Sequence, residues 1–134
     1  MRVWLIALTC TLLAACQDSA IIIDSDCPET GACTLALPSG ESVTLNLKGE
    51  LIAMQPLTLK VSSSSPIYQS RVVFTGVDMN MGILPYDLTQ TDFGAEGIGR
   101  VASCTEPSMT WQAQYQFVIN GQEYKINRQF VVEQ

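Results

Sequence analysis

The chain has 134 residues, with 7 basic and 13 acidic side chains, a formal net charge of −6 at pH 7 and no histidine. This negative charge disfavours a nucleic-acid partner and an electrostatic attachment to anionic lipid. The lack of histidine excludes catalytic triads with a histidine base and zinc sites built on imidazole ligands.

The N-terminal segment has the features of a bacterial lipoprotein signal. Arg2 precedes an apolar run over residues 3–12, which is too short to cross a bilayer as a helix. Residues 13–16, with the sequence LAAC, resemble the lipobox of lipoproteins. The resemblance implies that residues 1–15 are a signal peptide and that Cys16 is acylated, for example with palmitate, after cleavage. The alternative is an ordinary secretory signal with a coincidental cysteine, and in both cases the domain is exported.

An acylated Cys16 predicts the cellular location. Each buried methylene contributes about 0.8 kcal/mol and two acyl chains already anchor a protein stably, so membrane attachment would be effectively permanent. We expect the protein in the bacterial cell envelope, facing the periplasm, and Gln17 resembles the residue type of lipoproteins sent to the outer membrane. Residues 16–26 have no clear period and predict a lipidated tether, and residues 27–134 are long enough for one domain.

The first part of that domain has the period-two pattern of β-strands. Residues 33–37 alternate in polarity, residues 38–41 supply turn residues, and residues 43–47 alternate again, which predicts a hairpin. Residues 57–61 repeat the alternation and lead into a polar loop at residues 62–66.

The middle of the chain predicts two more strands. Residues 71–78 are rich in β-branched and aromatic side chains, as is typical of strands. Residues 94–99 are rich in glycine but lack the spacing of a dinucleotide-binding fingerprint, so they predict a flexible strand or a bulge.

The clearest local prediction is a long hairpin over residues 111–132. Asn120-Gly121 lies between two alternating runs and is the favoured sequence of a two-residue type I′ turn. Such a turn fixes the register and gives one largely apolar and one polar face. The predicted pairs on the apolar face are Ile119 with Gln122, Phe117 with Tyr124, Tyr115 with Ile126, Ala113 with Arg128 and Trp111 with Phe130.

Together these elements predict an all-β fold. No 3.6-residue period occurs after Cys16, and six to eight short strands with regular turn signals are expected. This pattern favours an immunoglobulin-like antiparallel β-sandwich over a barrel.

Three cysteines remain in the exported domain, where disulfides persist. Cys27 and Cys33 enclose the turn-prone residues 28–32, so we predict a disulfide between them. The alternative is a bond from Cys104 to either of the two. The first pairing leaves Cys104 as a free thiol.

Soft sulfur donors gather in two segments of the sequence. Met79 and Met81 follow the strand predicted at residues 71–78, while Cys104 and Met109 bracket a loop that contains a proline. Thiolate and thioether ligands select Cu(I), and in an extended strand Met79 and Met81 would share one face with Cα atoms about 6.6 Å apart. The alternative is that the methionines fill gaps in the core, and Met109 lies opposite Val132 in the hairpin register.

Two of these segments resemble YtkA-like and FixH-like exported domains: residues 72–85, and residues 104–111 with Met109-Thr110-Trp111. Those domains are small immunoglobulin-like sandwiches linked to copper handling and cytochrome oxidase assembly. The resemblance implies Met79, Met81, Cys104 and Met109 as ligands and Trp111 as a supporting core residue. This chain departs from many copper carriers of this architecture because it has no histidine, which argues against Cu(II) and leaves Cu(I) open.

Two functions follow from the sequence. The first is a membrane-tethered Cu(I)-binding module for copper handling or oxidase assembly. The second is a structural or interaction lipoprotein that docks a protein partner of the envelope without a metal. An enzyme is not expected, because no recognisable nucleophile is accompanied by a base.

Overall fold

The computed structural model describes residues 19–134, which form ten strands and no helix. The described part of the chain therefore has no helix that could cross a membrane. The predicted signal peptide and Cys16 lie outside the described residues.

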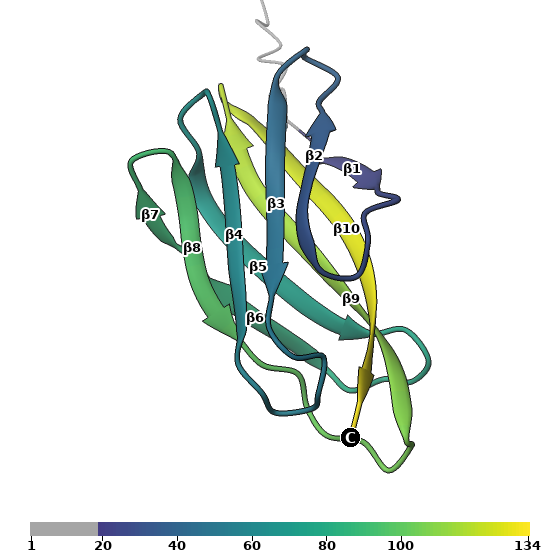
Figure 1. Ribbon diagram of the computed structural model, residues 1–134. Helices are drawn as coiled ribbons and strands as arrows, with labels where there is room; N and C mark the ends of the chain where they lie inside the picture. The colour runs from purple at the N-terminus through teal and green to yellow at the C-terminus, as the bar shows by residue number, and fades with distance from the viewer. Residues whose placement is uncertain (1–18) are drawn as a thin grey trace, which may run out of the picture.

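The strands form two five-stranded sheets that pack face to face (Figure 1). The first sheet has the order β1-β10-β9-β5-β6, and its pairs are antiparallel except for the parallel pair of β1 with β10. Its strands are β1 (Ile21–Asp24), β10 (Gln122–Glu133), β9 (Ser108–Ile119), β5 (Tyr68–Gly76) and β6 (Ile83–Asp87).

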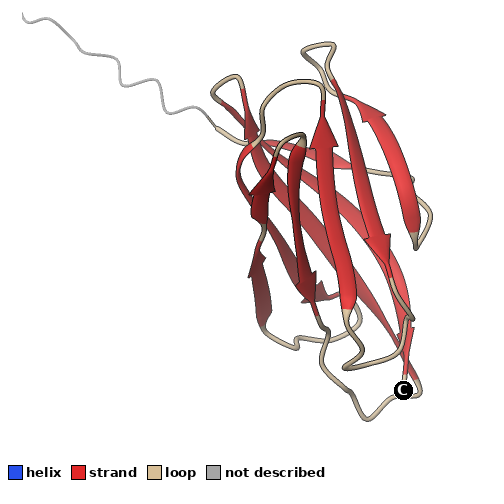
Figure 2. Ribbon diagram, turned by 60° about the vertical axis from the view of Figure 1, so that its left-hand side comes forward, coloured by secondary structure: helices blue, strands red, loops and turns tan. Residues whose placement is uncertain are grey.

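The second sheet is antiparallel throughout and has the order β2-β3-β4-β8-β7. Its strands are β2 (Gly31–Ala36), β3 (Ser42–Lys48), β4 (Leu57–Ser63), β8 (Gly94–Gly99) and β7 (Thr89–Thr91). In the view of Figure 2, strands and loops account for all of the described chain. The prediction of an all-β antiparallel sandwich is confirmed.

The described strands outnumber the six to eight that were expected, because three short strands at sheet edges have weak sequence signals. One of them, β1, lies within the predicted tether, so that prediction is wrong for residues 21–24. Ile21 and Ile23 pack against the core while Ile22 points outward, and the strand pairs in parallel with β10. Burial of alternate isoleucines explains why this segment joins the sheet.

The long hairpin of β9 and β10 has the predicted register. Its observed pairs include Ile119 with Gln122 and Trp111 with Phe130. Asn120 and Gly121 at the turn have φ values of 50° and 77°, as a type I′ turn requires. The register continues to Met109, which pairs with Val132.

The inward faces of the two sheets form one core. Trp111, Tyr115 and Phe117 on β9 are fully buried and face the leucines of β3 and β4 from the other sheet. The Tyr115 hydroxyl donates a hydrogen bond to the Asn46 carbonyl at 2.9 Å, which links the sheets. Burial raises the pKa of Tyr115, and the nearby Arg128 guanidinium opposes part of this shift.

Arg128 lies in this core with no exposed surface. Its Nε donates to the Pro28 carbonyl and its Nη2 to the Gly31 carbonyl, both at 2.8 Å. Burial lowers the pKa of Arg128, and Tyr115 offsets part of that effect. Arg128 lies on β10 of the first sheet, and it thus holds the loop before β2 of the second sheet against the first sheet.

The same loop is closed by the predicted disulfide. Cys27 and Cys33 are bonded, with their Cα atoms 5.8 Å apart. The alternative pairing of Cys104 with either of them is therefore wrong, and within residues 19–134 Cys104 has a free thiol. The loop also contacts β10 through Glu29, whose carboxylate accepts a hydrogen bond from the Val131 amide at 3.2 Å.

Candidate metal centre

Two loops meet at the end of the first sheet where β5 stops and β9 begins. These strands are antiparallel neighbours and Gly76 pairs with Trp111, so the residues after β5 lie beside the residues that open β9. The Val77 amide donates to the Thr110 carbonyl at 2.9 Å. The Thr110 amide in turn donates to the Asp78 carboxylate at 2.8 Å. Backbone pairing and one carboxylate therefore fix the first loop against β9.

This arrangement brings two of the four predicted sulfur ligands into contact. The Cys104 thiol donates to the Met79 thioether, with Sγ and Sδ 3.2 Å apart. Cys104 is half-buried and packs against the core, whereas Met79 is 36% exposed. The two sulfur atoms come from loops 25 residues apart in the sequence.

The predicted strand position of Met79 and Met81 is wrong. Strand β5 ends at Gly76, and the chain then bends before β6 begins at Ile83. The Asn80 side chain accepts a hydrogen bond from the Gly82 amide at 2.9 Å, and Gly82 has a φ of 77°. An Asx turn of this kind replaces extended backbone, so Met79 and Met81 do not lie on one strand face.

Met109 and Met81 are placed closer to the core. Met109 is 4% exposed on the inner face of β9, and Met81 is half-buried and packs against the core. A Cβ atom at Gly76 would overlap both the Met109 methyl group and the Met79 carbonyl oxygen. The Met109 side chain and the Met79 backbone therefore approach the same glycine, while Met81 is not part of the sulfur contact between Met79 and Cys104.

The side chains that gather where these two loops meet offer soft donors, namely the Cys104 thiol and the methionine thioethers. Across residues 19–134, no group of three or more acidic or cysteine side chains is arranged to hold a metal ion. A metal bound here would depend on thioethers in addition to the Cys104 thiolate. Such ligands suit Cu(I) and disfavour calcium or magnesium, which take oxygen ligands.

The sequence did not predict the roles of Gly76 and Asp78 in bringing the two loops together. Gly76 allows the close approach of the Met79 backbone, and Asp78 binds the first residues of β9. A glycine and a carboxylate directly after a strand are a weak signal, because neither shows which distant backbone group it will meet.

Comparisons with known proteins show the fold but no family. No family model matches the chain, and no curated protein matches it. Among solved structures, it is similar to the crystal structure of a Br derivative of BhCBM56, a carbohydrate-binding module. The TM-score is 0.51 at 12% sequence identity, over 78% of this chain and 99% of that chain. At this identity the similarity supports the β-sandwich fold alone.

Proposed function

We propose that this protein is a lipid-anchored Cu(I)-binding module. The observation that carries the proposal is the 3.2 Å contact between Cys104 Sγ and Met79 Sδ. A thiolate and a thioether side by side form the start of a soft-ligand site. In many soluble domains a methionine fills a gap in the core instead, but Met79 is exposed enough for an ion to reach it.

The distance also limits how the pair would bind. With metal–sulfur bonds of about 2.3 Å, as in zinc thiolate sites, ligands on opposite sides of an ion would lie about 4.6 Å apart. The two sulfur atoms are closer than that, so they would serve as adjacent ligands. A third ligand is then needed. Met109 and Met81 are the candidates, because the Met109 methyl group approaches Gly76 beside the Met79 carbonyl and Met81 follows Met79 by two residues.

The proposed setting is the bacterial envelope. Acylation at Cys16 would hold the domain at a membrane surface facing the periplasm, with the outer membrane favoured. The resemblance to YtkA-like and FixH-like domains supports a role in copper handling or oxidase assembly, in which the module carries or buffers Cu(I) for an envelope protein partner. Removal of residues 1–15 with Arg2 would leave 6 basic and 13 acidic side chains, and this formal charge of −7 favours approach of a cation.

The test is Cu(I) uptake by the purified, reduced protein in competition with a chromogenic chelator. We expect one Cu(I) per chain. The double substitution Met79→Leu with Met81→Leu should weaken binding at least about tenfold, because it removes one contacting thioether and one candidate third ligand. The matched control is Met54→Leu, which removes an exposed methionine outside the predicted ligand set and should leave the affinity unchanged.

Two results would contradict this proposal. Equal uptake by the double variant would show that these methionines are not ligands. If the unsubstituted protein takes up no Cu(I), the proposal of a metal site is wrong. The alternative of a lipoprotein that docks a protein partner is then favoured.

A further inference from the structure

A polar pocket lies at the other end of β5, away from the contact between Met79 and Cys104. Its volume is about 460 Å³, within the range of about 300–1,000 Å³ that is typical of small-molecule sites. It lies where β5 begins, next to the connection from β6 to β7. The polar side chains that line it are Gln69, Ser70, Arg71, Asp87, Gln90, Gln116 and Glu123.

The pocket forms at an irregularity in β5. The pairing of β5 with β9 shifts register between Tyr68 and Arg71, and Gln69 between them has a φ of 51°. Positive φ is uncommon for a residue with a side chain, and bulges of this kind redirect side chains near binding sites. The next residue, Ser70, is buried, and among the described residues its hydroxyl has no hydrogen-bond partner.

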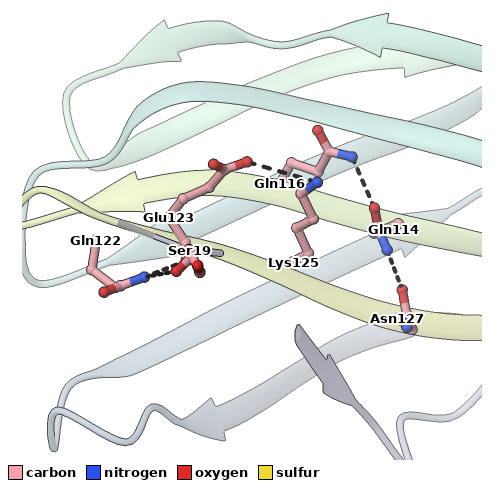
Figure 3. Close-up of polar contacts among 7 residues, drawn as sticks. All are labelled: Ser19, Gln114, Gln116, Gln122, Glu123, Lys125 and Asn127. Atoms are coloured by element: carbon pink, nitrogen blue, oxygen red, sulfur yellow. Dashed lines mark hydrogen bonds and ion pairs between the residues drawn. The ribbon is translucent and has the colours of Figure 1, made fainter. Parts of the chain in front are cut away.

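Two of the lining groups are held in place by other side chains. Arg71 donates from Nε and Nη2 to the same oxygen of Asp87, at 3.1 and 2.9 Å, so the second carboxylate oxygen stays available as an acceptor. Gln116 donates from its amide nitrogen to Gln114 at 2.8 Å, and Gln114 donates to Asn127 at 2.9 Å (Figure 3). These two side-chain hydrogen bonds fix the Gln116 side chain and leave its oxygen available as an acceptor.

The charges of the lining select among ligand classes. Arg71 is already paired with Asp87, and the second carboxylate of the lining, Glu123, lies 4.0 Å from the Lys125 ammonium, so the lining offers no unpaired cation to an anionic ligand. Fewer than three acidic side chains line the pocket, which is a poor site for a metal ion. Amides and carboxylates suit a neutral ligand with many hydroxyl groups, since each hydroxyl both donates and accepts a hydrogen bond.

We propose that this pocket binds one or two sugar units of a neutral glycan. The amides and carboxylates would bond to the hydroxyl groups, while Ile67 and Leu88 provide apolar surface for the ring carbons. This site is separate from the proposed Cu(I) site, because its residues come from the opposite end of β5. The two proposals can therefore fail independently.

The test uses the purified protein and a panel of neutral hexasaccharides of glucose, mannose, galactose and N-acetylglucosamine, together with sulfated and carboxylated oligosaccharides, measured by NMR titration. We expect at least one of them to bind with a dissociation constant of about 1 mM or tighter. Gln116→Ala and Asp87→Asn should each weaken that binding at least about fivefold, because each removes an oriented acceptor. Gln112→Ala is the matched control, since Gln112 shares the outward face of β9 but lies outside the pocket.

Three results would overturn the proposal: no binding by any member of the panel, equal binding by the Gln116 and Asp87 variants, or binding confined to sulfated or carboxylated oligosaccharides. One further substitution separates this site from the metal site. Met79→Leu should leave glycan binding unchanged whether or not the protein binds Cu(I).

Discussion

Replacing Cys104 with serine is expected to lower the affinity of the protein for Cu(I) by at least about a hundredfold. Loss of a partner that merely orients a ligand already costs about 10–100-fold in many metal sites, and Cys104 would be a ligand itself. A serine hydroxyl is a hard donor that stays protonated near neutral pH, so it does not replace a thiolate for Cu(I). The measurement is the chelator competition described above, made on the reduced protein.

Ser103→Ala is the control for this substitution, because Ser103 is an exposed neighbour in the same loop. Thiol labelling of the denatured, unreduced protein checks the premise that Cys104 is a free thiol. An affinity within about threefold of the unsubstituted protein in the Cys104→Ser variant would show that the thiolate is not a ligand.

Replacing Arg128 with methionine is expected to lower the free energy of unfolding by about 3 kcal/mol. The substitution leaves the Pro28 and Gly31 carbonyl oxygens without their buried donors, and each such group costs about 1–3 kcal/mol. Removing a desolvated guanidinium offsets part of this loss, since burial of a charge is itself unfavourable. Methionine retains most of the apolar volume, so the effect is assigned to the hydrogen bonds.

Urea unfolding followed by tryptophan fluorescence measures this change, with Trp111 in the core as a probe. Arg71→Met is the matched control, because it removes an exposed arginine whose ion pair with Asp87 should contribute less than about 1 kcal/mol. If the two variants lose the same stability, Arg128 does not hold the disulfide loop in the way that its contacts indicate.

The strands that could be predicted from the sequence are those with strong local signals. The turn at Asn120-Gly121 fixed the register of β9 and β10, because a two-residue loop sets every pair that follows. The hairpin of β2 and β3 was predictable for the same reason, with alternation on both sides of a turn. The Cys27–Cys33 disulfide followed from proximity in sequence.

Features that depend on distant partners could not be predicted. The strand β1 forms because β10 offers an edge to residues 21–24, and nothing in those four residues specifies that edge. The loop after Gly76 is fixed against β9 by the bond from Thr110 to Asp78, which joins residues 32 apart in the sequence. The bend at Met79 and Met81 is different, because it contains a local Asx turn between Asn80 and Gly82 whose signal was overlooked when extended backbone was expected.

For Arg128, the position in the sheet could be predicted but its hydrogen-bond partners could not. The predicted register placed it opposite Ala113 on the apolar face, and that pairing is observed. The carbonyl groups that accept from its Nε and Nη2 belong to a loop about 100 residues earlier, so only the fold reveals these partners, and Nη1 has no partner among the described residues. The pocket at the β5 bulge was missed for a similar reason, since its lining comes from several strands.

The most direct test of the central proposal is X-ray absorption at the copper K-edge of the Cu(I)-loaded protein. We expect a Cu(I) edge and a coordination shell made of sulfur, which loses a neighbour when Met79 is replaced by leucine. A shell of nitrogen or oxygen neighbours, or a sulfur shell that is the same in the Met79→Leu variant, would contradict the assignment of Cys104 and Met79 as ligands.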